Sequence, residues 1–161
     1  MTYTYVEADL DDPRHRIAVR DLIDAYARDP MGMGAPLPED VLDRLIPGLR
    51  AHPSCIVFLA LAGEEPVGVA VCFVGFSTFA ARPLLNVHDL AVVPQHRRRG
   101  VARGLLEHVE RRARELGCVK LTLEVLEDNL AAQALYRSLG FTDADLGAGV
   151  RRTWFLERRL C

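Results

Sequence analysis

The chain has 161 residues, 50% hydrophobic and 26% charged, with a formal net charge of −2. That length and composition fit one globular domain over residues 1–161 and exclude a disordered chain. The slightly negative charge argues against a nucleic-acid partner, since nucleic-acid-binding domains are usually basic overall. No apolar run reaches membrane-spanning length, and residues 1–7 do not begin a secretory signal. We therefore expect a cytoplasmic protein with no membrane partner.

The cysteines are widely spaced, and the chain contains neither a C-x-x-C nor an H-E-x-x-H motif. This pattern predicts neither a zinc site nor a disulfide framework. Cys55, Cys72 and Cys118 lie in or beside apolar runs, as buried thiols commonly do. We therefore expect no metal cofactor.

Hydrophobic periodicity and turn residues predict eleven elements. In chain order they are a strand at 3–8, helices at 13–28 and 38–49, strands at 54–62, 67–76 and 84–93, a helix at 101–116, a strand at 119–125, a helix at 130–139 and strands at 141–146 and 151–159. Asp12 and Pro13 form the expected start of the first helix. Pro47-Gly48 should break or kink the second helix.

A basic turn joins the third of these helices to the strand before it. Its sequence over residues 94–102 is Pro-Gln-His-Arg-Arg-Arg-Gly-Val-Ala. A helix start offers unpaired N–H groups and the positive end of the helix dipole, so an anion is stabilised there. Small residues let a diphosphate approach the backbone, and arginines add charge-assisted hydrogen bonds. The residues expected to bind it are Arg97, Arg98, Arg99, Gly100, Val101 and Ala102. Three adjacent arginines also occur on plain solvated surfaces and in nucleic-acid patches.

Neither a Walker loop nor the dinucleotide pattern G-x-G-x-x-G occurs in the chain. Arg97-x-x-Gly100-x-Ala102 directly after a strand resembles the acetyl-coenzyme A signature of the GNAT N-acetyltransferase superfamily. The pattern Asn129-x-x-Ala132-x-x-x-Tyr136-x-x-x-Gly140-Phe141 follows at that family's spacing. The resemblance covers nearly the whole chain. It implies an α/β fold with a mixed sheet and the element order β-α-α-β-β-β-α-β-α-β-β.

The resemblance implies an acetyl-coenzyme A-dependent N-acetyltransferase. It would pass the acetyl group to a primary amine, on a small molecule or a protein N-terminus, by direct attack in a ternary complex. In family members, backbone groups at a bulge of the fourth strand donate to the tetrahedral oxyanion formed from the thioester, which maps to Leu90, Ala91 and Val92. Asn129 falls on the residue that binds the pantetheine arm. It is equally suited to be the N-cap of the helix after it.

An alkyl amine has a pKa of about 10.4 and arrives as ammonium, so a general base must remove a proton. Glu124 matches the glutamate of the ribosomal-protein acetyltransferase subgroup, and His88 matches the histidine of the arylalkylamine type. Asp89 is a third candidate, and strand alternation predicts that it faces away from His88. Tyr136 falls on the tyrosine that protonates the leaving thiolate, although it could instead be a core aromatic.

An alternative function of a different class is a non-catalytic module that binds acyl-coenzyme A as a sensor or partner domain. A nucleic-acid role for the three arginines is a distant third possibility. The acceptor side is expected at residues 29–37, where Asp29 could bind a cationic amine, and at 143–152. Neither the acceptor nor the oligomeric state follows from the sequence, and a homodimer stays open.

Overall fold

The computed structural model describes residues 2–143 and 158–159. The chain divides into two compact units, Met1–Glu127 and Asp128–Cys161. The first unit contains β1 (Tyr3–Glu7), α1 (Pro13–Arg28), α2 (Glu39–Ala51), β2 (Cys55–Ala62), β3 (Glu65–Ser77), β4 (Arg82–Val92), a 3-10 turn (Pro94–His96), α3 (Val101–Glu115) and β5 (Leu121–Leu123). The second unit contains α4 (Leu130–Ser138). The strands expected at 141–146 and 151–159 fall largely outside the described residues.

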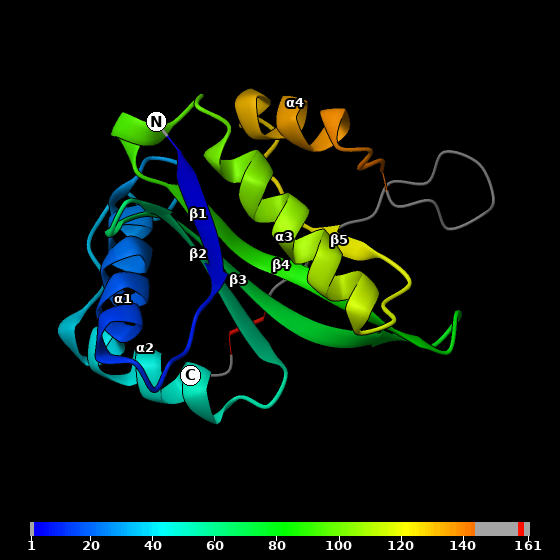
Figure 1. Cartoon of the computed structure of the whole chain (residues 1–161), viewed down its shortest axis with the longest axis horizontal. Helices are drawn as coiled ribbons and strands as arrows, with labels where there is room; N and C mark the ends of the chain where they lie inside the picture. Colours follow the sequence, from blue (N-terminus) through cyan, green and yellow to red (C-terminus); the bar gives the residue numbers. More distant parts are fainter. Residues whose placement is uncertain (1, 144–157, 160–161) are drawn as a thin grey trace. The chain divides into compact units, whose positions relative to one another are not determined.

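The five strands form one mixed sheet in the order β1-β2-β3-β4-β5 (Figure 1). The first four are antiparallel neighbours, whereas β5 runs parallel to β4. A parallel neighbour requires a crossover, and α3 is the helix between β4 and β5. The mixed α/β fold expected from the sequence is confirmed.

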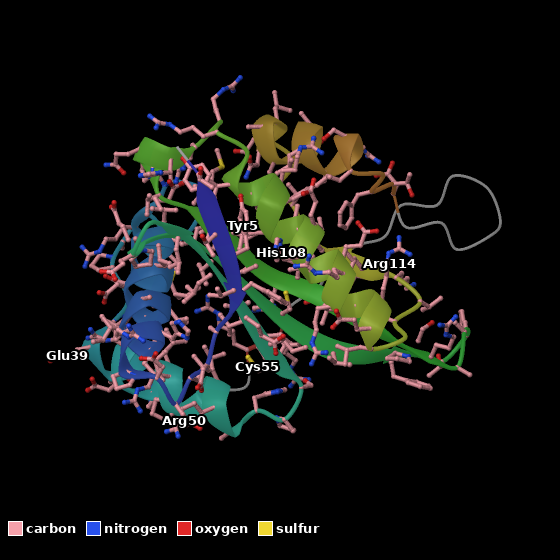
Figure 2. All side chains as sticks on the ribbon, viewed as in Figure 1. Tyr5, Glu39, Arg50, Cys55, His108 and Arg114 are labelled. Carbon is pink, nitrogen blue, oxygen red and sulfur yellow. The ribbon has the colours of Figure 1, made fainter. Side chains whose placement is uncertain are left out.

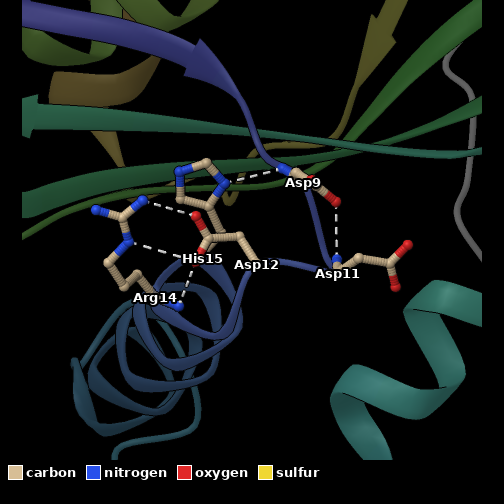
Figure 3. A network of polar contacts seen from close by, with 5 residues as sticks. All are labelled: Asp9, Asp11, Asp12, Arg14 and His15. Carbon is tan, nitrogen blue, oxygen red and sulfur yellow. Dashed lines mark hydrogen bonds and ion pairs between the residues drawn. The ribbon is translucent and has the colours of Figure 1, made fainter.

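The start of α1 agrees with its predicted cap (Figure 3). The Asp12 carboxylate accepts a hydrogen bond from the Arg14 N–H at 2.8 Å, and Pro13 is the first helical residue. The Arg14 guanidinium also binds this carboxylate and lowers its pKa. His15 Nδ1 accepts from the Asp9 N–H at 3.0 Å and ties the helix to the end of β1.

The sequence predicted that Pro47-Gly48 breaks or kinks this helix, and the break is excluded because α2 continues to Ala51. A proline removes a single helical hydrogen bond. Ile46 is buried in the core cluster beneath α1, and Leu49 packs against that cluster. These contacts hold the last turn of α2 in place despite the lost bond.

The two faces of the sheet are covered by different helices. Val19 and Leu22 of α1 pack with alternate residues of β2 and β3, namely Val57, Leu59, Val69 and Val71. Leu105 of α3 lies against Gly68, whose neighbour Val69 faces α1, so α3 covers the opposite face. On the α3 side, the Tyr5 ring of β1 lies 4.8 Å from the His108 ring (Figure 2).

Of the helices in the described part of the chain, none combines the length and the apolar character needed to cross a membrane.

Candidate active site

A bulge interrupts β4 at His88. Asp89 lies opposite Val71 of β3, and Val87 lies opposite the next residue, Cys72, so His88 is the extra residue. The family resemblance mapped this bulge to residues 90–92, and the structure places it two residues earlier. The His88 side chain is exposed, and its ring meets the Phe73 ring edge-on at 5.5 Å.

The bulge also changes which side chains share a face. Asp89 pairs with Val71, and the His88 ring contacts Phe73. Val71 and Phe73 both pack in the core on the α1 side of the sheet. His88 and Asp89 therefore lie on the same face, and the prediction that they face opposite sides is wrong. Alternation fails here because a bulged residue does not take its own place in the ladder.

The strands β4 and β5 run together for three residues only, with Leu85–Val87 beside Leu121–Leu123. A side-chain hydrogen bond also joins β4 to β5 here, because Asn86 Nδ2 donates to Thr122 Oγ1 at 3.1 Å. Beyond it β4 continues to Val92, and among the described residues no strand pairs with that edge. Glu124 is exposed and directly follows β5. The three candidate bases thus adjoin the point where the two strands part.

The unpaired edge of β4 presents backbone donors. The Val93 N–H donates to the Val67 carbonyl of the neighbouring chain segment at 3.0 Å. Hydrogen-bonding direction alternates along an antiparallel strand, so the N–H groups of Leu90 and Val92 point away from β3, toward the open edge. Ala91, by the same alternation, bonds to β3. Of the three residues predicted to donate to the oxyanion, two therefore have N–H groups available to a ligand at this edge.

Asp89 is half-buried, and burial raises the pKa of its carboxyl, an effect that the neighbouring His88 opposes. The pKa of Tyr26 in α1 is also raised, first by burial and then by the charges of Asp89 and Asp29. Burial raises the pKa of the Cys72 thiol to about 12, so this thiol is not a nucleophile at neutral pH. A carboxyl group with a raised pKa is a better proton acceptor than an exposed one.

The predicted phosphate loop follows β4 and leads into α3. Arg98 and Gly100 have the left-handed φ values of 58° and 84°. Gly100 is the N-cap of α3 and has no side chain that could accept a hydrogen bond from the first turn. A helix start without a side-chain cap has N–H groups that an anion can bind. The start of α3 therefore offers backbone N–H groups to an anion, and diphosphate binding by this loop stays a prediction.

The three arginines of this loop differ in their surroundings. Arg97 Nε donates to the Val92 carbonyl at 2.9 Å, and its Nη2 donates to the Asp29 carboxylate at 2.6 Å. Arg98 and Arg99 are exposed and form no ion pair with any described residue. The phosphate-binding interpretation therefore fits Arg98 and Arg99 better than Arg97. Asp29, proposed from the sequence as a partner of a cationic acceptor, is already paired.

Asn129 and Tyr136 belong to the second unit. Asn129 caps α4, since its side-chain oxygen accepts from the Ala132 N–H at 3.2 Å. The Tyr136 ring lies 5.8 Å from the Phe141 ring, and the Phe141 N–H donates to the Tyr136 carbonyl at 3.0 Å. The structural roles considered for both residues are therefore present. Their catalytic and cofactor roles stay predictions.

Sequence reasoning missed Asn86 and the pairing of Asp29 with Arg97. A polar residue within the apolar run 84–93 was the available signal for Asn86. Nothing in the sequence pointed from Arg97 to a partner 68 positions away. Within residues 2–143 and 158–159, no group of three or more His, Cys, Asp or Glu side chains could hold a metal ion.

Comparison with known proteins bears on this site. The family model described as acetyltransferase (GNAT) family matches residues 18–141. Thialysine N-epsilon-acetyltransferase of Caenorhabditis elegans is 36% identical over 101 residues, which are 63% of this chain and 60% of that protein. The [Ribosomal protein bS18]-alanine N-acetyltransferase of Escherichia coli K12 is 42% identical over 70 residues, 44% of this chain and 45% of that protein. The matches thus span less than two thirds of these relatives.

The fold has close counterparts among solved structures. The structure of AAC(6')-Iy in complex with the bisubstrate analog CoA-S-monomethyl-acetylneamine aligns with a TM-score of 0.77 at 19% identity, covering 99% of each chain. A probable acetyltransferase aligns with a TM-score of 0.76 at 24% identity, covering 98% of this chain and 100% of that one. At these identities the likeness shows the shared fold.

Proposed function

The chain belongs to the acetyltransferase (GNAT) family, and on that premise we propose that it is an acetyl-coenzyme A-dependent N-acetyltransferase. It transfers the acetyl group to a primary amine by direct attack in a ternary complex. The observation that carries the proposal is the open edge of β4. Donors at Leu90 and Val92 lie on this edge, and α3, whose start has no side-chain cap, begins nine residues after Val92.

The co-substrate is bound along this edge. The N–H groups of Leu90 and Val92 bind carbonyl groups of its acyl and pantetheine portion. The diphosphate is bound by residues 98–102, with Arg98 and Arg99 supplying positive charge. Asn129 contributes a further hydrogen bond to the pantetheine arm. No metal ion takes part in this scheme.

The chemistry requires three proton transfers. The acceptor ammonium loses a proton, and its nitrogen attacks the thioester carbon. The attacking nitrogen then loses a second proton, which leaves it as the nitrogen of the neutral amide. The C–S bond breaks, and the departing thiolate, whose thiol pKa is about 8.5, is protonated. We assign the general base to the group His88, Asp89 and Glu124 near the β4–β5 junction, and the acid to Tyr136. The N–H group of Leu90 or Val92, on the open edge of β4, stabilises the oxyanion of the tetrahedral intermediate.

The acceptor is a small amine or a protein N-terminus. The names of the relatives include thialysine, an alanine of a ribosomal protein and aminoglycosides. These acceptors share only the amine, so they support the reaction class without selecting a substrate.

A panel of amines tests the proposal, with release of free thiol from acetyl-coenzyme A as the readout. We expect turnover with at least one class of primary amine. For His88→Gln we expect kcat/KM to fall by roughly 10²-fold or more if His88 is the base. Asp89→Asn and Glu124→Gln report on the other two candidates. Tight binding of acetyl-coenzyme A without turnover on any amine would favour the sensor alternative, and no binding at all would refute both.

A further inference from the structure

Asp29 organises the loop that follows α1. Its N–H donates to the Tyr26 carbonyl at 3.0 Å and ends the helix. Its carboxylate Oδ1 accepts from the Met31 N–H at 2.9 Å. Its carbonyl accepts from the N–H groups of Gly32 at 2.8 Å and Gly34 at 3.2 Å. A Cβ on Gly32 would lie 2.2 Å from the Tyr26 carbonyl oxygen, so the loop folds too tightly onto α1 for any other residue. The loop 29–35 is thus held in one conformation.

Arg97 connects this loop to the open edge of β4, along which we propose that coenzyme A binds. One guanidinium binds Asp29 Oδ2 at 2.6 Å and the Val92 carbonyl at 2.9 Å. The Asp29 side chain is 12% exposed, so this end of the ion pair is shielded from water. The Met31 N–H and the Arg97 guanidinium, in that order, lower the pKa of Asp29. The carboxylate therefore stays ionised and paired at neutral pH.

The geometry requires an arginine. The Nε and Nη2 donors of a guanidinium are fixed in one plane, so binding both acceptors fixes the loop relative to β4. A lysine ammonium at this position would keep the charge without that fixed fork. We propose that Arg97 is a positioning residue, which holds the loop 29–35 against the open edge of β4 and does not bind the diphosphate. The diphosphate is then left to Arg98 and Arg99.

This inference rests on the proposed function, because the loop 29–35 belongs to the segment expected to line the acceptor side. With its carboxylate bound to Arg97, Asp29 does not receive the acceptor ammonium. The loop instead presents Met31 and Met33, which are 37% and 67% exposed. Thioether side chains are apolar and adaptable, so this side of the acceptor site suits the apolar part of an amine.

Four variants test the role: Arg97→Gln, Arg97→Lys, Asp29→Asn and Arg98→Gln. Hydrogen exchange of the Met31, Gly32 and Gly34 amides is measured without any ligand. In Arg97→Gln and Asp29→Asn we expect exchange to quicken by roughly tenfold or more, because a charge-assisted hydrogen bond stabilises by about that factor or more. A variant that combines Arg97→Gln with Asp29→Asn should exchange little faster than either single variant, because both substitutions break the same ion pair. Arg98→Gln should leave these amides at the wild-type rate.

Kinetics supply the second readout. Arg97→Gln should raise the acceptor KM more than it weakens coenzyme A binding in calorimetry, and Arg97→Lys should recover part of that loss. Arg98→Gln should show the reverse pattern. Wild-type exchange in Arg97→Gln, together with a loss of coenzyme A affinity like that of Arg98→Gln, would overturn the inference. If the wild type does not bind coenzyme A, the proposed function fails, while the exchange experiment still decides whether Arg97 holds the loop.

Discussion

The Asn86 side chain donates from a single Nδ2 to both the Oγ1 and the carbonyl of Thr122, at 3.1 Å and 3.3 Å. These two residues are the middle pair of the three that join β4 to β5. The contact therefore lies one residue before the strands cease to pair, and it fixes where the open edge begins.

Asn86→Ala should destabilise the protein by about 1 kcal/mol, because it removes the donor and leaves both Thr122 acceptors without this hydrogen bond. Urea unfolding measures this change. Thr122→Val is the matched control, because it keeps the carbonyl acceptor and should cost less. Unfolding of Asn86→Ala at the wild-type urea concentration would show that the contact does not hold the junction.

Gly100→Glu should weaken coenzyme A binding by roughly 10²-fold or more, because it places a negative charge where charge-assisted hydrogen bonds are expected. Calorimetry measures the affinity. Gly63→Glu in the β2–β3 turn is the control. Both glycines have left-handed φ values, 84° and 65°, and both have open space around the missing Cβ. Each change should therefore cost roughly 1–2 kcal/mol of backbone strain. Equal affinities in the two variants would refute the phosphate loop.

Asp89→Asn should stabilise the protein at pH 7. Burial raises the pKa of Asp89 in the folded state, so the folded chain holds this proton more tightly than the unfolded chain does. Stability then falls as the pH rises from the unfolded pKa through the folded pKa, and stays lower above that window. The gain should vanish at about pH 3, below the ordinary aspartate pKa. Urea midpoints at both pH values test this, with the exposed Asp21→Asn as control.

Tyr136→Phe should lower turnover by roughly 10²-fold or more if this hydroxyl protonates the thiolate. The ring and its contact with Phe141 remain, so coenzyme A affinity should barely change. Tyr5→Phe, which removes a hydroxyl beside α3, should keep its activity. Near-wild-type turnover in Tyr136→Phe, with chemistry shown to be rate-limiting, would leave Tyr136 as a packing residue.

The sequence predicted most elements well, because their signals are local. The cap at Asp12, the hairpin turn near Gly63 and the apolar stripe of α3 each depend on a few neighbouring residues. The order of elements along the chain matched the family resemblance, whereas the order of strands in the sheet comes from the structure.

The errors arose where distant contacts decide the outcome. Alternation placed His88 and Asp89 on opposite faces, and only the register against β3 reveals the extra residue. Pro47 breaks helices in isolation, yet the packing of Ile46 and Leu49 carries α2 past it. Arg97 looked like its neighbours Arg98 and Arg99 until the folded loop brought Asp29 beside it.

The open edge of β4 has a cost as well as a use. An unpaired strand edge offers N–H and C=O groups to any extended peptide and so invites strand addition between molecules. The Val92 carbonyl is shielded from this, because Arg97 already binds it. The N–H groups of Leu90 and Val92 have no comparable hydrogen-bond partner among the described residues. A bound co-substrate would fill that role, so coenzyme A should act on this protein as a solubility factor, and the ligand-free chain should aggregate first.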